Sequence, residues 1–305
     1  MHAADITVLI PLHESATWLQ AIRGNLSRLA GHVSIIVSDA TVRDDTLSVL
    51  EQEWGGREGI TLLGGRGLRP GWVAHYNDLL ARVRTPRFLW LAHDDDIDAG
   101  YVAILSRTLD EHPEAAGACG LLEPIEGPGL IHVPQPRMPP PANDRFRFRA
   151  NQLLFEWNLG VAFRGLFRHE RVGPIPATTA CDEWADLAWL YGVCLEHPLI
   201  QTDRTIYRKR FTMTSTHAAW RARFHPLGLP YLIREISRRK SLDTPVAVIE
   251  EIISHSIAHF ERGSAESGTR IAVAFEQLAA THREPPTARE GHIRSRPDHQ
   301  ADARG

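Results

Sequence analysis

A regular alternation of strand and helix patterns in the first part of the chain constrains the fold most. Short β-branched and aliphatic runs predict buried strands at residues 5–12, 32–40, 59–65 and 87–95. Amphipathic segments between these strands predict helices at 15–31, 45–54 and 71–83. This order requires right-handed βαβ units. We therefore predict an α/β fold with a mostly parallel central sheet that is flanked by helices.

The second part of the chain has a different character. Residues 123–141 are rich in proline, which predicts a long ordered loop or a flap. Strand and turn patterns follow at 159–173, and a helical pattern follows at 181–196. After these come two or three amphipathic helices and a tail with almost no aliphatic side chains. We divide the chain into a first half, a second half, a C-terminal helical extension and a disordered tail, at residues 1–120, 121–225, 226–282 and 283–305.

Composition excludes several classes of partner and site. The formal net charge is −3 and the pI is about 6.6, so no overall basic field would recruit nucleic acid or anionic lipid. Cys119, Cys181 and Cys194 have no CxxC spacing, which argues against a disulfide framework or structural zinc. The N-terminus lacks a signal-peptide pattern, and no apolar run could cross a bilayer. We expect a cytoplasmic protein.

The fourth predicted strand leads directly into Asp94, Asp95 and Asp96, with Asp98 close behind. Adjacent carboxylates repel one another unless a cation or strong hydrogen-bond donors lie among them. One interpretation is that Asp94 and Asp96 hold Mg²⁺ or Mn²⁺ where an α/β sheet binds its ligand. The alternative is that the acids cap a helix that begins near Ala99, a role that suits Asp98. We favour the metal, because one cap does not require four acids.

Polar residues also follow the other predicted strands. Asp39 ends the second strand, where an acid can contact a base or ribose or can bond to the backbone of a turn, and position alone leaves both open. Residues 64–71 are glycine-rich but match neither GxGxxG nor a P-loop. No GxSxG, HExxH or CxxC is present. These absences argue against dinucleotide-binding domains, P-loop NTPases, serine hydrolases and zinc enzymes.

Four segments together carry a resemblance to a known family. They are ITVLIPLHES, SIIVSDATVRDDT, WVAHYNDLL and FLWLAHDDDID. In order and spacing they resemble the nucleotide-sugar-binding half of family 2 glycosyltransferases, which have the GT-A fold. The similarity covers residues 5–120 well and continues loosely to 215. The resemblance implies that a metal at the acidic signature bridges the diphosphate of a nucleotide sugar. It also implies a donor-binding set of Pro11, Leu12, His13, Glu14, Asp39, Asp94 and Asp95.

The chain departs from this family at two positions near the donor site. Tyr76 and Asn77 stand where the family usually has Arg-Asn, so a phosphate contact is either lost or supplied by Arg66 or Arg69. His93 replaces the first acid of the family's signature. We still assign Asn77 and Arg66 to the donor site.

The family's general base is the Asp of a Glu-Asp pair that opens a helix. This chain offers Asp182, Glu183 and Asp186, although one alignment puts Trp184 at the position of the base. We expect Asp182 to be the base and Glu183 to be the second choice. The alternative is that these acids form a solvated helix N-terminus.

The segment YRKRFTMTSTHAAW resembles the family's segment after the last core strand, where the family often has a His at the position of Arg210. His217 lies in the same segment. It could be a third metal ligand, a phosphate donor or an ordinary packing residue. The resemblance predicts a metal-dependent, inverting transfer of a sugar from a nucleotide diphosphate sugar to an unknown acceptor hydroxyl. Alternatives are an Mg²⁺-dependent enzyme similar to nucleotidyltransferases and a non-catalytic nucleotide-sugar-binding or scaffold protein of the same fold.

Overall fold

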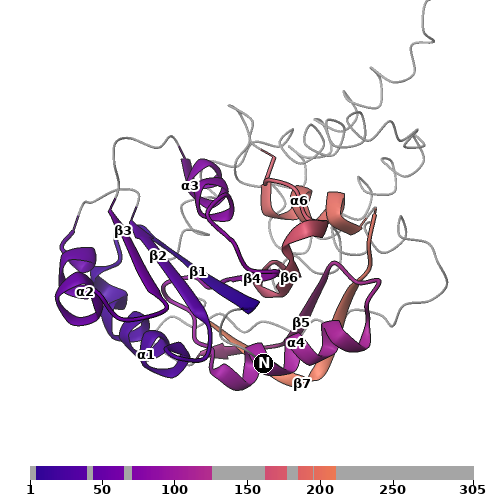
Figure 1. The fold of residues 1–305 in the computed structure, drawn as a ribbon, viewed down its shortest axis with the longest axis horizontal. Helices are drawn as coiled ribbons and strands as arrows, with labels where there is room; N and C mark the ends of the chain where they lie inside the picture. Colours follow the sequence, from indigo (N-terminus) through magenta and orange to yellow (C-terminus); the bar gives the residue numbers. More distant parts are fainter. Residues whose placement is uncertain are drawn as a thin grey trace, which may run out of the picture.

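The computed structural model describes residues 5–39, 44–64, 71–125, 162–176, 185–194 and 196–210. Within these residues the chain forms one sheet with strand order β3-β2-β1-β4-β6-β5-β7 (Figure 1). The strands are β1 Ile6–Leu12, β2 Ser34–Asp39, β3 Ile60–Gly64, β4 Arg87–Trp90, β5 Gly117–Ile125, β6 Leu166–Arg168 and β7 Leu199–Arg210. The helices are η2 Ala16–Trp18, α1 Leu19–Leu29, α2 Thr46–Trp54, α3 Gly71–Leu80, α4 Ala99–Glu111, η3 Ala162–Arg164, η4 His169–Arg171 and α6 Ala185–Cys194.

The sheet is mostly parallel, as the sequence predicts. Strand β1 pairs in parallel with β2 and β4, β2 with β3, and β5 with β7. Only β6 runs antiparallel to both of its neighbours, β4 and β5. The first half of the chain therefore forms successive βαβ units, with the carboxyl ends of β1, β2 and β4 at one edge.

Helices cover both faces of the sheet (Figure 1). Side chains alternate between the faces along each strand, so Phe88 and Trp90 of β4 lie in one core cluster and Leu89 lies in the other. The cluster with Phe88 and Trp90 also contains residues of α3 and α6, and the other contains residues of α1, α2 and α4. Two buried faces account for the continuous apolar runs of the central strands.

Several element boundaries differ from the predicted ones. Strand β4 ends at Trp90 because a turn follows, in which the Asp95 amide donates to the Ala92 carbonyl at 3.2 Å. Strand β5 continues to Ile125 and so includes Pro124 of the proline-rich segment. Proline is tolerated on an unpaired side of a strand, and within the described residues β6 pairs with β5 only at Gly117 and Ala118, well before Pro124.

Part of the prediction lies outside the described residues. This applies to most of the proline-rich segment, the C-terminal helical extension and the tail. It also applies to five assigned or candidate site residues: Arg66, Arg69, Asp182, Glu183 and His217. Among the residues that are described, no helix is both long enough and apolar enough to span a membrane.

Candidate functional site at the carboxyl ends of the strands

The ends of β1 and β2 place two predicted binding segments side by side. Asp39 pairs in register with Leu12 on one side and with Gly64 on the other, and it is only 2% exposed. Pro11 and Leu12 are buried in the sheet, whereas His13 and Glu14 just beyond them are exposed. Of the four predicted donor-binding residues at positions 11–14, only His13 and Glu14 therefore present their side chains to solvent.

The acidic loop after β4 is held in place from two directions. From α1, Asn25 Nδ2 donates to the Asp95 carbonyl at 2.9 Å, and Arg28 Nε donates to the Ile97 carbonyl at 3.1 Å. From β7, the Arg208 amide donates to the Asp96 carbonyl at 3.2 Å, and the Asp96 amide donates in return at 2.9 Å. These contacts hold the backbone of the acidic loop between α1 and β7.

Asp95 points into the protein. Its side chain is 1% exposed, and its Oδ2 accepts a hydrogen bond from the Tyr207 hydroxyl at 2.8 Å. Its Oδ1 accepts from the Arg210 amide at 2.9 Å, and the Arg164 Nε lies 3.4 Å from Oδ2. Both carboxylate oxygens are thus engaged by the chain, and Asp95 anchors the loop to β7.

Asp96 turns towards α1 and forms an ion pair with Arg28. Its carboxylate is about one-third exposed, so this pair is partly solvated. The two candidate metal ligands, Asp94 and Asp96, therefore differ in availability, because Asp96 already has a cationic partner.

Asp94 is the acid of this loop whose carboxylate has the fewest partners among the described residues. No other residue in the described part of the chain donates a hydrogen bond to its carboxylate, while its carbonyl accepts one from Arg210 Nε at 3.3 Å. Burial and repulsion from Asp95 raise the pKa of Asp94 to about 6, against the opposing effect of Arg164. A carboxylate with a raised pKa that lies at the ligand end of the sheet is a typical functional group.

The chain itself supplies the positive charge that the adjacent acids require. Arg164 and Lys209 are mostly buried next to the loop. Burial and Arg164 lower the pKa of Lys209 to about 8, although Asp95, Asp186 and Asp94 act in the opposite direction. Burial also opposes the charge on Arg164, yet nearby Tyr207 and Asp95 leave its pKa above the usual value. Neither cation was recognised from the sequence, because both are remote from the acids along the chain.

Helix α6 brings a further acid to this cluster. Asp186 lies in the first turn of α6, and its charge acts on both Lys209 and Tyr76. Burial raises the pKa of Tyr76 to about 12, with Asp94 and Asp186 contributing against Arg164. The Tyr76 ring packs on Trp90 at a centroid distance of 4.7 Å. Tyr76 therefore lies between the acidic loop and α6 rather than in solvent.

Two of the predicted polar residues have structural roles. Asn77 exchanges two hydrogen bonds with the backbone of Ile175, at 2.8 and 2.7 Å, so its amide holds the segment before α6. Asp98 is the N-cap of α4, and its Oδ1 accepts from the Tyr101 amide at 2.8 Å. The capping interpretation is thus confirmed for Asp98.

The described residues could supply only some of the ligands that a metal ion needs. They contain no group of three or more His, Cys, Asp and Glu side chains placed to hold a metal ion. Mg²⁺, however, commonly binds through one or two carboxylates together with waters and substrate phosphates. Asp94 together with a bound diphosphate fits that mode of binding. The described side chains do not by themselves surround an ion.

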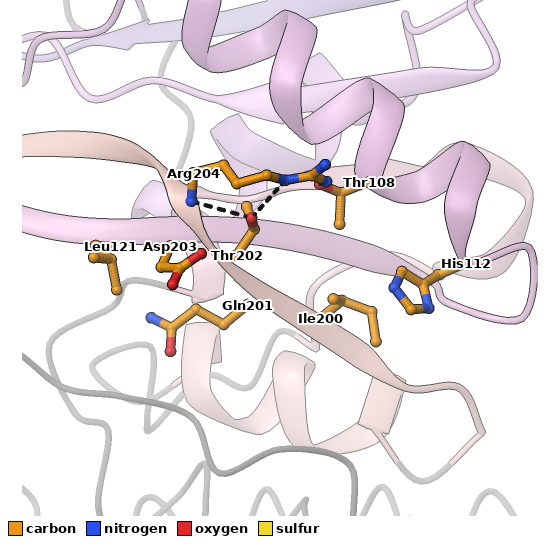
Figure 2. Close-up of a pocket in the computed structure, with 8 residues that line it drawn as sticks. All are labelled: Thr108, His112, Leu121, Ile200, Gln201, Thr202, Asp203 and Arg204. Carbon is orange, nitrogen blue, oxygen red and sulfur yellow. Dashed lines mark hydrogen bonds between the residues drawn. The ribbon is translucent and has the colours of Figure 1, made fainter.

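Away from the acidic loop, a hollow of about 330 Å³ lies between α4 and the first part of β7 (Figure 2). Its lining comprises Thr108, His112, Leu121, Ile200, Gln201, Thr202, Asp203 and Arg204. Arg204 donates to the Thr202 hydroxyl at 3.2 Å and pairs with Glu111 at 2.7 Å, so its charge is already compensated. The acidic loop contacts the opposite end of β7, and we place the candidate site there.

Comparison with known proteins identifies the fold. No family model and no curated protein matches the sequence. Among solved structures, S. aureus TarS 1–349 in complex with UDP-GlcNAc is similar, with a TM-score of 0.63, 14% identity, and coverage of 90% of this chain and 81% of that chain. The chain has the GT-A fold. The UDP complex of the same TarS fragment gives a TM-score of 0.55 at 13% identity, with coverage of 91% and 92%. The GT-A fold and the mostly parallel sheet that the sequence predicts are therefore confirmed.

Proposed function

We propose that this GT-A protein is a metal-dependent, inverting glycosyltransferase of family 2 that uses a nucleotide diphosphate sugar as donor. The observation that carries the proposal is the Asp94 carboxylate, which accepts no hydrogen bond from another described residue and lies at the edge where β1, β2 and β4 end. Asp39 and the exposed His13 and Glu14 lie at the same edge. Because the TarS structures contain UDP-GlcNAc and UDP, UDP sugars are the first donors to test.

The residues divide into three roles. Asp39 would accept a hydrogen bond from the nucleoside part of the donor. Asp94 would hold Mg²⁺ or Mn²⁺, which when bound neutralises the charge that develops on the leaving diphosphate. An acid at the start of α6 would deprotonate the acceptor hydroxyl as the hydroxyl attacks the anomeric carbon from the opposite face. We keep Asp182 as the proposed base, with Glu183 second, and Asp186 as a neighbouring acid.

A non-catalytic nucleotide-sugar-binding protein is the second candidate. Two departures from the family favour it, namely Tyr76 in place of the usual Arg and Trp184 at one possible position of the base. For either candidate we propose a cytoplasmic location, as the sequence predicts.

Replacing Asp39 with Ala should weaken binding of UDP by about 1–3 kcal/mol, the typical value of a hydrogen bond to a charged group. Titration calorimetry measures this difference directly. Asp110→Ala is the matched control, because Asp110 is an exposed acid that pairs with Arg87 at the opposite end of β4. If Asp39→Ala and the control bind UDP equally well, Asp39 is a turn residue.

Asp94→Asn should remove the increase in UDP affinity that Mn²⁺ provides, whereas Asp96→Asn should retain most of it. The reason is that the Asp96 carboxylate is paired with Arg28, whereas no described residue forms an ion pair with Asp94. Calorimetry with UDP in the presence and absence of Mn²⁺ compares the two variants. The reverse pattern would assign the metal to Asp96.

A further inference from the structure

A buried hydrogen bond joins the loop after β1 to the acidic loop after β4. The Ser15 Oγ lies 2.6 Å from the Nδ1 of His93, and Ser15 is 1% exposed. Ser15 occupies the N-cap position of η2, but its side chain makes no capping bond. It lies against His93 instead, whose ring also packs near Trp18 at a centroid distance of 6.5 Å.

The chemistry of the two groups indicates which one donates. A neutral imidazole has one N–H and one nitrogen that accepts a hydrogen bond, and a serine hydroxyl can donate one hydrogen. Ser15 Oγ already accepts a hydrogen bond from the His13 amide at 2.9 Å. With the hydrogen of the Ser15 hydroxyl directed at Nδ1, the imidazole hydrogen lies on Nε2, and nitrogen NMR of the histidine side chain tests this arrangement.

The loop that this bond holds is strained. Glu14 has a φ of +49°, in the left-handed region that residues other than glycine rarely adopt. Such a conformation costs free energy and persists only where the surrounding structure imposes it. On its other side the loop is tied to α2 through Asp44, whose carboxylate accepts from the Ala16 amide and from the Thr46 amide, each at 3.0 Å. Residues 13–16 are thus held between the acidic loop and α2.

We propose that Ser15 and His93 are positioning residues, and that their hydrogen bond holds His13 and Glu14 at the edge of the acidic loop. The inference rests on the proposed donor site, because it is the nucleoside diphosphate that would contact both loops. Without the bond, the segment with the strained Glu14 loses its attachment to the acidic loop through His93. The loop would then have to be ordered again when the ligand binds, which lowers affinity.

Ser15→Ala and His93→Leu should each weaken UDP binding about fivefold to tenfold, which corresponds to one hydrogen bond. The double variant should be no weaker than either single variant, because both changes remove the same contact. His93→Asn should bind nearly as well as the wild type, since its side-chain oxygen can replace Nδ1 as the acceptor. Additive losses, or no recovery with His93→Asn, would overturn the proposal.

A spectroscopic measurement tests the bond without any ligand. Nitrogen NMR of the histidine side chains should show His93 as the neutral Nε2–H form in the wild type, with its signal identified by its loss in His93→Asn. Ser15→Ala should shift the Nδ1 resonance, and an Nδ1–H form in the wild type would overturn the assignment. If the wild type binds neither UDP nor GDP, the proposed donor site is wrong, and non-additive unfolding free energies of the same variants still test the Ser15–His93 bond.

Discussion

Asp182→Asn should lower the turnover of sugar transfer by about 10²–10⁴, the usual contribution of a general base. Donor affinity should be unchanged, because proton transfer from the acceptor stabilises the transition state and not the bound donor. Steady-state kinetics with a working donor and acceptor gives the turnover, and calorimetry with UDP gives the donor affinity. The pattern expected is a fall in kcat with an unaltered dissociation constant for UDP.

Glu183→Gln and Asp186→Asn are the matched variants for this experiment. Asp186 is a serious competitor for the role, because its charge acts on Tyr76 and Lys209 within the cluster around Asp94. A large loss confined to one of these two variants would move the base to that residue. Normal turnover in all three variants would contradict a base at the start of α6.

Arg164→Met should lower the free energy of unfolding by about 3–5 kcal/mol, because it leaves Asp95 buried without its cationic neighbour. Arg164 is mostly buried, and its Nε lies 3.4 Å from a carboxylate that is 1% exposed. No hydrogen-bond partner satisfies that Nε within the described residues, so its contribution is the charge that it places beside Asp95. Urea denaturation at constant pH measures the loss.

Arg23→Met provides the control for the loss of an arginine at the surface. Arg23 of α1 pairs with Glu53 of α2, and both side chains are partly exposed to solvent. Removal of Arg23 should therefore leave the midpoint of denaturation almost unchanged. Adding Asp95→Asn to Arg164→Met should recover part of the loss, since the uncompensated charge is then removed. Equal effects of Arg164→Met and Arg23→Met would contradict a buried ionic cluster beneath the acidic loop.

The sheet could be predicted because its signals are local. In β1 and β4 the continuous apolar pattern reflects burial on both faces, and the residues that follow each strand are then brought to one edge by parallel pairing. The position of Asp94 at that edge follows from this reasoning alone. The same reasoning predicts that Asp39 lies close to the loop after β1.

The electrostatics of the site could not be predicted, because they depend on contacts between distant segments. The sequence suggests that the adjacent acids lack a cation, yet Arg28 from α1, Arg164 from η3 and Lys209 from β7 lie around them. No local pattern marks these three residues. The same reason explains why Asp95 and Asp96, which look equivalent to Asp94 in the sequence, turn to partners within the protein.

The roles of two other residues were missed because each makes a tertiary contact that competes with a local one. Ser15 is a residue type typical of helix N-caps, but its side chain forms a hydrogen bond with His93, which lies 78 residues further along the chain. Asn77 resembles a ligand residue of the third helix but is occupied by the backbone of Ile175. In both cases the partner lies far away in sequence, and only the fold brings it close.

Slow hydrolysis of the donor tests the central claim most directly, because a glycosyltransferase can transfer its sugar to water when no acceptor is present. The protein should release UDP or GDP from at least one sugar in a panel of UDP and GDP sugars when Mg²⁺ or Mn²⁺ is supplied. Asp94→Asn should not release it under the same conditions. Release of nucleotide by the wild type and by Asp94→Asn at equal rates, or from no donor at all, would contradict a nucleotide-sugar transferase site at the acidic loop.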